Sequence, residues 1–480
     1  MIFSSLTFLI FFTIVAALTA LTNIKRLQRA LPVPALELRQ AILLLASYVF
    51  YGWWNWKCCL LMLLLTAVAW FCAQGYGRTA RKPYIVAGVV FPLVILGVFK
   101  YFNFFVDSFC DLFGIAQSGA LSILLPVGIS FYTFQSLSYT IDVYRGQLEP
   151  ERSFKRVALY IAFFPQLVAG PIVKAGEFIP QLHEDRTITL EGLEKGVQYF
   201  AFGLFKKLVI ADNISVFVDA VYQNPNEFHA LTIILAVAAY AMQIYCDFSG
   251  YSDMAVGCAK CLGYDLARNF NLPYLSRNLG EMWKRWHISL SSWLMEYLYI
   301  PLGGNRKGRV RTYINLFLTM LIGGLWHGAA WTFVAWGGMH GVGLCVHRLL
   351  THGKKTADGP VESVTLTMLR GIWPYTYFAL CLVFFRSDSF HTALEIFSGM
   401  LRWSGGVIHI GSWAVIGIAM VAAGELAAVI RCKRLHVRLD GFYPTVRLST
   451  VPGLVLFFLF VGVTLGLAYT GENPFIYFQF

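Results

Sequence analysis

The chain has 480 residues, of which 57% are hydrophobic, 16% are aromatic and only 13% are charged. Soluble domains carry roughly 25% charged residues, so this chain has too few polar side chains to cover a water-facing surface. Its formal net charge of +12 comes from basic residues in the short connections between apolar runs. That distribution is typical of the cytoplasmic loops of membrane proteins, and it argues against a nucleic-acid-binding surface. Composition therefore excludes a soluble protein.

Apolar runs long enough to cross a bilayer recur along the whole chain. A helix needs about 20 residues to cross a hydrocarbon core of roughly 30 Å. We therefore expect an all-α polytopic membrane protein with about ten to twelve transmembrane helices, together with re-entrant or interfacial helices. The candidate spans are 2–21, 41–71, 86–105, 122–141, 157–173, 197–210, 231–248, 313–326, 331–346, 364–385, 413–430 and 451–469.

The two ends of the chain and its middle part differ in composition. No charged side chain precedes Lys25, so the basic region of a cleaved signal peptide is missing and the first helix should remain as an anchor, with the N-terminus on the outer side. From Leu125 to Met339, polar residues, Pro and Gly enter the apolar segments. Irregular backbone at membrane depth is tolerated only inside protein or along a water-filled cavity. We expect a single domain over 1–480, with a catalytic middle part at about 120–350.

Two stretches of the middle part are too irregular for plain lipid-facing helices. In the first, Pro126 and Gly128 open a run whose polar side chains include Tyr132 and Gln135. This run is either a packed inner helix, with small and hydroxylated residues as contacts, or a direct substrate contact. In the second, at 163–171, two prolines and a glycine predict a broken or re-entrant segment, which could line a tunnel or serve only packing.

Three polar residues, Asp247, Ser249 and Asp253, stand at and just beyond the end of the span at 231–248. A carboxylate costs roughly 2.5–3.5 kcal/mol at the middle of a membrane on insertion scales, so it usually faces a cavity or a basic partner. The candidate partners in the following sequence are Arg268, Arg277 and Arg285. Structural ion pairing and a place in a substrate channel both remain open.

The stretch at 281–297 predicts one continuous amphipathic helix, lying at the interface or tucked into the protein. Its aromatic and leucine residues recur at i, i+3, i+4 and i+7. The apolar face carries Trp283, Trp286, His287, Leu290, Trp293, Leu294 and Tyr297, and the polar face carries Arg285, Ser289, Ser292 and Glu296. His287 lies on the aromatic side, where a satisfied structural histidine and a functional one are both open.

His327 lies inside an apolar span, and its neighbours in sequence are small. These neighbours are Gly323, Gly324, Gly328, Ala329 and Ala330. We expect them to clear space around the imidazole for a substrate chain. Desolvation keeps a buried imidazole neutral, which is the state that a general base needs near neutral pH. A hydrogen bond between helices is the structural alternative.

Metal binding is not predicted. His340 and His347 lie 347 − 340 = 7 positions apart, which is about 10.5 Å along a helix and too far for one ion to bridge unaided. The sequence also contains no His-Glu pair of the zinc-protease kind.

Taken in order, these stretches resemble the membrane-bound O-acyltransferase family, and within it the bacterial branch of alginate O-acetylation membrane proteins. The resemblance extends over nearly the whole chain. It rests on MIFSS at 1–5, ASYVFY at 46–51, the run at 125–145, DFSGYSDM at 247–254, WKRWHISLS at 283–291, YIPLGGN at 299–305 and GGLWHG at 323–328.

The resemblance implies roles for individual residues. The family's intramembrane catalytic histidine matches His327, and its second polar residue, which is Asn, Asp or His by branch, matches His287, since 327 − 287 = 40. The family places this pair in a central tunnel, whose lining candidates here are Asp247, Ser249, Asp253, Tyr132, Gln135 and Trp326. Lys284 and Arg285 are candidates for holding the phosphates of the donor, and solvated loop charge is the equally good alternative for both.

The resemblance also implies substrates, a partner and a location. No cofactor stays bound; the donor is a cytoplasmic thioester, either acetyl-coenzyme A or an acyl carrier protein. The acyl group, expected to be acetyl, would pass through the bacterial inner membrane to a periplasmic partner resembling an SGNH hydrolase, for O-acetylation of an exported polysaccharide. The competing classes are a polysaccharide or lipid transporter, which should contain internal repeats with paired broken helices, and a non-catalytic docking scaffold.

Overall fold

A computed structural model of the chain describes residues 1–24, 29, 33–115, 124–168, 170–351, 359–361, 363–471 and 473–476. All the secondary-structure elements named within these residues are helices, which confirms the all-α class. The chain forms two compact units, one of Met1–Ala201 with Tyr251–Ala267 and one of Phe202–Gly250 with Arg268–Phe480. Neither unit is continuous in sequence, and the single domain expected over 1–480 stays a prediction.

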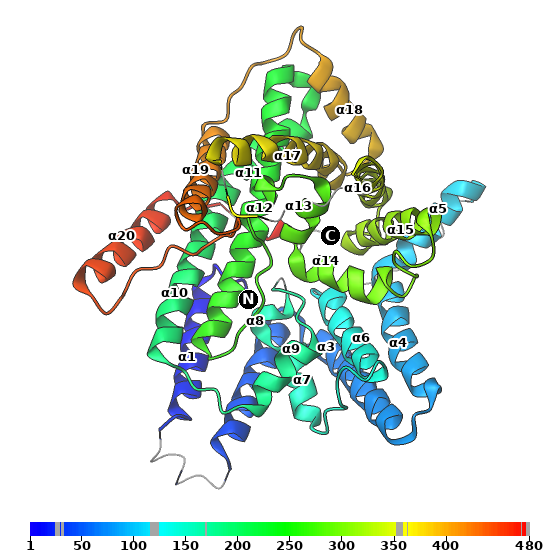
Figure 1. Cartoon of the computed structure of the whole chain (residues 1–480), viewed down its shortest axis with the longest axis vertical. Coiled ribbons are helices and arrows are strands. Elements are labelled where there is room, and N and C mark those ends of the chain that lie inside the picture. The colour runs from blue at the N-terminus through cyan, green and yellow to red at the C-terminus, as the bar shows by residue number, and fades with distance from the viewer. Residues whose placement is uncertain are drawn as a thin grey trace. The chain divides into compact units, whose positions relative to one another are not determined.

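The first unit is built around one long helix, α3 (Ala35–Thr79), which packs against α1, α4, α6 and α7 (Figure 1). The predicted span at 41–71 is in fact broken within α3, because Asn55 has an extended backbone (φ −159°, ψ 110°). The other helices of this unit are α1 (Leu6–Leu21), α4 (Lys82–Leu96), η1 (Gly97–Tyr101), α5 (Phe102–Phe113), α6 (Ile129–Tyr144), α7 (Phe154–Ala162), α8 (Phe164–Leu167), α9 (Ala175–His183) and most of α10 (Leu190–Phe205).

Both irregular stretches of the middle part fall in the first unit. Every residue of α6 from Ile129 to Thr140 is buried, as expected for a packed inner helix. The stretch at 163–171 is broken, as predicted: α7 ends at Ala162, Phe163 has a non-helical backbone, and α8 is a single turn of four residues.

The second unit contains the remaining helices. They are η2 (Lys206–Ala211), α11 (Asp212–Gln223), η3 (Pro225–Glu227), the first part of α12 (Ala230–Cys261), η4 (Pro273–Leu275), α13 (Leu279–Arg285), α14 (Ile288–Leu294), η5 (Met295–Tyr299), α15 (Arg309–His327), α16 (Trp331–Leu350), α17 (Val364–Arg386), α18 (Phe390–Leu401), α19 (Ser412–Arg434) and α20 (Val451–Leu467).

Within this unit, α15 and α16 form a tight helical hairpin, because glycines let their backbones touch. A Cβ atom on Gly324 would lie 2.3 Å from the carbonyl oxygen of Phe333, and one on Gly337 would lie 2.4 Å from that of Met320. No real side chain tolerates such distances, so the helices could not approach this closely with larger residues. This hairpin holds the end of α15, where His327 lies.

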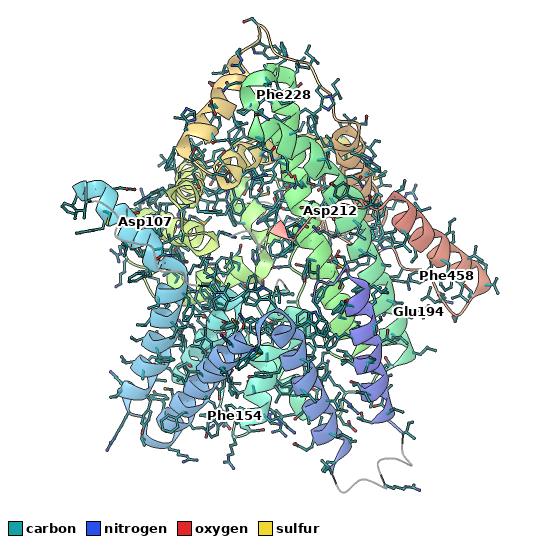
Figure 2. The ribbon with its side chains drawn as sticks, turned by 180° about the vertical axis from the view of Figure 1, so that it is seen from behind. Asp107, Phe154, Glu194, Asp212, Phe228 and Phe458 are labelled. Carbon is teal, nitrogen blue, oxygen red and sulfur yellow. The ribbon has the colours of Figure 1, made fainter. Side chains whose placement is uncertain are left out.

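The long helices are apolar enough to cross a membrane. Five helices of the described chain qualify by length and composition, namely Ala35–Thr79, Lys82–Phe113, Ala230–Cys261, Val364–Arg386 and Ser412–Arg434. Two shorter helices, α1 and α20, are also apolar. On α20, Phe458 is 65% exposed and points away from the rest of its unit (Figure 2), as a lipid-facing side chain would. A multi-pass membrane protein is confirmed, and the count of ten to twelve spans stays a prediction.

Candidate active site

The predicted helix at 281–297 is not continuous, and the break occurs at His287. Helix α13 ends at Arg285, and α14 begins at Ile288. Between them, His287 adopts a left-handed backbone (φ 42°, ψ 56°), which non-glycine residues rarely occupy. The amphipathic spacing predicted one helix and missed the break, because the break is imposed by a segment distant in sequence.

That segment contains Asn269, which pairs with the chain on both sides of His287. The backbone N–H of Ile288 donates to the carbonyl of Asn269 (2.8 Å), and the N–H of Asn271 donates to the carbonyl of Arg285 (2.9 Å). These two bonds replace the helical hydrogen bonds that the sequence pattern would otherwise favour. Asn269 itself is 1% exposed, and His287 is fully buried.

The side chain of Asn269 fixes the proton on the His287 ring. Its Oδ1 accepts from the backbone N–H of Ser289 (3.2 Å) and from the hydroxyl of Ser289 (2.9 Å), and it lies 3.1 Å from Nδ1 of His287. A backbone N–H can only donate, so the asparagine atom is the oxygen, and Nδ1 of His287 must carry the hydrogen. In a neutral imidazole this leaves the lone pair on Nε2.

His287 lies between two helices of seven residues each, outside the five candidate spans. Burial lowers the pKa of His287 to about 3, so the ring is neutral at physiological pH. The sequence pattern placed Ser289 on the polar face of a helix, opposite His287. Ser289 is 5% exposed and shares the Asn269 oxygen with His287.

His327 is the last residue of α15, and its ring lies near that of His287. The two ring centroids are 6.4 Å apart, and His327 is 5% exposed. Aromatic rings surround it: Trp326 at 5.0 Å, Trp336 at 5.0 Å and Phe385 at 5.4 Å. The structure therefore brings together three predicted site residues, His287, His327 and Trp326.

The small neighbours of His327 serve a different purpose from the one expected. Gly324 accommodates the backbone of α16, and a Cβ atom on Gly328 would lie 2.1 Å from the ring of Phe333. These glycines therefore admit protein, and the expectation that they clear space for a substrate chain is wrong for both. The glycines beside His327 in the sequence therefore indicated close packing against α16.

A third buried imidazole, His340, extends this aromatic group, and sequence reasoning considered it only as a metal ligand. Its ring lies 4.8 Å from Trp336 and 5.0 Å from Trp283, nearly perpendicular to the latter. Trp336 thus contacts both His327 and His340 from one side of α16. The i, i+4 spacing of Trp336 and His340 was the available signal.

Asp247 is held by a lysine that the sequence interpretation overlooked. Lys207 Nζ lies 2.7 Å from Asp247 and 2.7 Å from Asp212, with all three side chains at most 5% exposed. The chain near the C-terminus joins this cluster: Asn473 donates to Asp212 (2.9 Å), and the backbone N–H of Ile476 donates to Asp247 (2.9 Å). Asp212, the labelled member, appears in Figure 2. Structural ion pairing is therefore the reading that the geometry favours for Asp247.

None of the three arginines suggested as partners of Asp247 fills that role. Arg268 pairs with Asp440 at 3.0 Å, and Arg277 and Arg285 both pair with Glu281, at 2.9 and 3.0 Å. The adjacent Phe248 ring contacts the His287 ring at 4.6 Å, which links the charged cluster to the candidate site.

The other predicted site residues are dispersed. Ser249 accepts a hydrogen bond from Lys206 (2.9 Å) in the second unit. Tyr132, Gln135 and Asp253 are buried in the first unit, where Tyr132 packs against Tyr51 at 6.1 Å. Lys284 is exposed, whereas Arg285 lines a pocket. The role of each in substrate contact stays a prediction, as does the central tunnel.

Two buried imidazoles among aromatic rings are suited to moving a proton. The lone pair on His287 Nε2 can accept a hydrogen bond or a proton, and the nearby His327 can act on the same bound group. Such sites exclude water, which strengthens every polar interaction with a substrate.

Comparison with known proteins identifies the chemistry. A family model described as "MBOAT, membrane-bound O-acyltransferase family" matches residues 150–358. A relative from Pseudomonas putida named "Probable alginate O-acetylase AlgI" is 36% identical and covers 92% of this chain and 94% of that protein. The "Peptidoglycan O-acetyltransferase" of Helicobacter pylori is 36% identical over 76% of this chain and 74% of its own.

A more distant relative, the "Teichoic acid D-alanyltransferase" of Streptococcus thermophilus, is 28% identical and covers 59% of this chain and 71% of that protein. The family model lies across both predicted catalytic histidines, and the relative from Pseudomonas putida spans almost the whole of both chains. The chain therefore belongs to the membrane-bound O-acyltransferase family and is a membrane-embedded acyltransferase.

Proposed function

We propose that the chain transfers an acetyl group from a cytoplasmic thioester across the membrane, for O-acetylation of an exported polysaccharide. Two relatives at 36% identity are named for O-acetyl transfer, one to alginate and one to peptidoglycan. The relative named for D-alanyl transfer is less similar, at 28%. These names favour acetyl over D-alanyl as the transferred group, and they leave the polysaccharide open.

The observation that carries the mechanism is the pair of buried imidazoles 6.4 Å apart. In this mechanism His327 removes the proton from an acceptor hydroxyl as the hydroxyl oxygen attacks the thioester carbonyl. The tetrahedral intermediate then collapses, the carbon–sulfur bond breaks, and the leaving thiolate takes the proton back from His327. A positioned general base contributes roughly 10²–10⁴-fold to the rate.

The role of His287 follows from its tautomer. A neutral ring with its hydrogen on Nδ1 presents only a lone pair at Nε2, so this nitrogen cannot donate to a thioester carbonyl. Of the two roles that the resemblance suggested, polarising the carbonyl is therefore disfavoured. Orienting a substrate remains, with Nε2 accepting a hydrogen bond from an amide N–H of the donor or from the acceptor hydroxyl.

The acetyl group would leave the enzyme on the outer side of the bacterial inner membrane. There a periplasmic partner of the SGNH hydrolase type would accept it and modify the polysaccharide. Support for this arrangement comes from the resemblance of the chain to its bacterial branch and from the basic loops, which indicate the cytoplasmic side. A passage between the two sides would let both substrates meet at the histidines, where their high effective concentration adds to the rate.

The test is transfer by purified protein in lipid nanodiscs, supplied with labelled acetyl-coenzyme A and a candidate periplasmic partner. We expect His327→Ala to lower the initial rate of thioester loss by 10²-fold or more. His347→Ala is the matched control, because His347 lies on the adjacent helix α16 and has no assigned role.

If His327→Ala folds normally and transfers acetyl at the parental rate, His327 is not the base. If the parental protein consumes no acetyl-coenzyme A but reacts with an acetylated carrier protein, the donor is the acyl carrier protein. Hydrolysis without labelling of any partner would contradict transfer across the membrane.

A further inference from the structure

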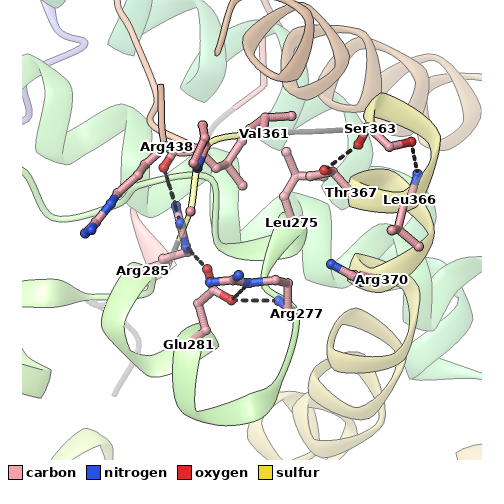
Figure 3. Close-up of a pocket in the computed structure, with 13 residues that line it drawn as sticks. Leu275, Arg277, Glu281, Arg285, Val361, Ser363, Leu366, Thr367, Arg370 and Arg438 are labelled. Carbon is pink, nitrogen blue, oxygen red and sulfur yellow. Dashed lines mark hydrogen bonds and ion pairs between the residues drawn. The ribbon is translucent and has the colours of Figure 1, made fainter. Parts of the chain in front are cut away.

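A basic pocket in the second unit lies beside the segment that carries His287. The cavity has a volume of about 240 Å³. Its walls come from α13, from the start of α17 and from two short extended stretches at 359–361 and 438–439 (Figure 3). This space is large enough for several water molecules, and therefore for a phosphate group.

The pocket carries a net positive charge. Glu281 lies between Arg277 and Arg285 and pairs with both, at 2.9 and 3.0 Å. Burial alone would raise the pKa of Glu281, but the hydrogen bonds and charges of the two arginines outweigh burial, so the pKa is lowered and the carboxylate stays ionised. Arg370, on α17, is the third arginine of the lining. Among the described residues that line the pocket, arginines outnumber the single carboxylate of Glu281, so this lining is positively charged.

Arg370 is the group best placed to bind an incoming anion. Figure 3 shows its guanidinium pointing from α17 towards Arg277. Among the described residues it makes no hydrogen bond or ion pair, whereas Arg277 and Arg285 already hold Glu281. The guanidinium of Arg438, another lining residue, points away from the pocket in the same view. Arginine is well suited to phosphate, because its planar fork can donate two parallel hydrogen bonds.

The start of α17 adds neutral hydrogen-bonding groups to the same wall. Ser363 caps this helix by accepting from the N–H of Leu366 (3.3 Å), and the hydroxyl of Thr367 donates to the carbonyl of Ser363 (2.7 Å). The positive end of the helix dipole therefore faces the pocket, which favours an anion there. Arginines, hydroxyl groups and a helix start together make a site for phosphate.

The side of the membrane on which the pocket lies limits which phosphate compounds can reach it. Helix α17 is a candidate span, and the pocket lies at its first turns. The adjacent end of α19 and the chain after it carry Arg431, Lys433, Arg434 and Arg438. Basic ends of this kind lie on the cytoplasmic side. The cytoplasmic substrate of the proposed reaction is a thioester whose carrier arm, in coenzyme A or in an acyl carrier protein, bears phosphate.

The pocket is joined to His287 through the backbone. Arg285 lies two residues before His287, and its carbonyl accepts from the N–H of Asn271 (2.9 Å) while its guanidinium donates to the carbonyl of the same residue (3.1 Å). Asn269, two residues earlier, holds the His287 ring. A phosphate bound by Arg285 would therefore contact one of the two paired segments that position the His287 imidazole.

We propose that the pocket of Arg277, Glu281, Arg285 and Arg370 binds the phosphate groups of the acyl donor. This inference rests on the proposed function, since it takes the cytoplasmic thioester as the donor. It retains Arg285 from the sequence analysis and replaces Lys284, which does not line the pocket, by Arg277 and Arg370. The other source of the same chemistry is the phosphate of an anionic lipid headgroup, which the test separates.

The test is equilibrium binding of unacylated coenzyme A to the full chain in nanodiscs of neutral lipid, compared with 4′-phosphopantetheine and with pantetheine, which has no phosphate. Removing one charged hydrogen-bonding group costs roughly 10- to 100-fold in affinity. We expect Arg370→Ala to weaken coenzyme A binding by that factor and to leave the weaker binding of pantetheine unchanged. Arg434→Ala, at the exposed basic end of α19 and outside the pocket lining, is the matched control and should bind as the parent does.

Binding is measured without transfer, so this test can fail separately from the proposed function. If Arg370→Ala and the parent bind coenzyme A equally, the proposal is wrong even when acetyl transfer proceeds. If the substitution instead abolishes retention of labelled phosphatidylglycerol and spares coenzyme A, the pocket is a lipid site. A phosphate-dependent loss of binding in a protein that transfers no acetyl group would support the pocket and contradict the function.

Discussion

Replacing Asn269 tests whether the His287 tautomer matters for catalysis. One oxygen of Asn269 accepts three hydrogen bonds at 2.9–3.2 Å, one of them from His287 Nδ1. In Asn269→Ala the ring loses the acceptor that holds its hydrogen on Nδ1. A typical hydrogen bond contributes a net 0.5–1.5 kcal/mol, and 1.4 kcal/mol corresponds to about tenfold in a population or a rate.

We therefore expect Asn269→Ala to lower kcat by about tenfold, because a smaller fraction of the enzyme has the productive tautomer. The KM of the donor should change little if His287 Nε2 binds the acceptor hydroxyl, and it should rise if Nε2 binds an amide N–H of the donor. Asn269→Asp keeps the acceptor oxygen and adds a negative charge, which favours the imidazolium form. That variant should retain more activity than the alanine variant at neutral pH, and the acid limb of its pH–rate profile should move to higher pH.

The assay is initial-rate acetyl transfer across a pH series, with thermal unfolding of each variant followed in parallel. Ser289→Ala provides the control, because it removes one of the three hydrogen bonds without touching the imidazole. The reasoning is refuted if folded Asn269→Ala turns over at the parental rate, or if Ser289→Ala loses as much activity as Asn269→Ala does.

Two further predictions concern stability. The folded pKa of His287 is about 3 against 6.5 for the free side chain, so the unfolded chain binds more protons between these values, and stability falls as the pH drops below 6.5. At pH 5 the loss from this residue is about 2 kcal/mol, and thermal unfolding of His287→Asn should show a smaller acid loss than the parent; equal losses would contradict the assignment. Gly324→Ala should destabilise the protein by about 1–3 kcal/mol, since its Cβ would meet a carbonyl oxygen of α16 at 2.3 Å. Gly338→Ala, whose nearest neighbour would be at 3.6 Å, should unfold at the parental temperature, and a similar loss in both would rule out the close contact as the cause.

The sequence was sufficient for the features that depend on composition along a single segment. Apolar runs predicted the membrane class, and the prolines and glycine at 163–171 predicted a broken segment. The pairing of His287 with His327 was different in kind. Nothing in the local pattern places residues 40 positions apart together; the resemblance to a family supplied that expectation, and the ring distance of 6.4 Å agrees with it.

The features that escaped sequence reasoning arise between segments far apart in the chain. The left-handed turn at His287 depends on Asn269. The helical periodicity at 281–297 does not predict that contact, because Asn269 lies outside this stretch. The partner of Asp247 is Lys207, a lysine inside an apolar run, where an arginine nearer in sequence was expected. The lysines Lys206 and Lys207 in such a run were a usable signal, because burying a lysine without a carboxylate is costly.

The left-handed backbone at position 287 limits which residues can stand there. Among residues with a Cβ atom, Asn, Asp and His enter this region several times more often than others, and β-branched residues scarcely enter it at all. The resemblance described in the sequence analysis implies Asn, Asp or His at the matching position of the family. Two independent demands, a polar group and a tolerated torsion angle, thus converge on the same three amino acids. Backbone conformation therefore limits substitution at this position as much as chemistry does, and a valine there would be strained even in a protein that needed no imidazole.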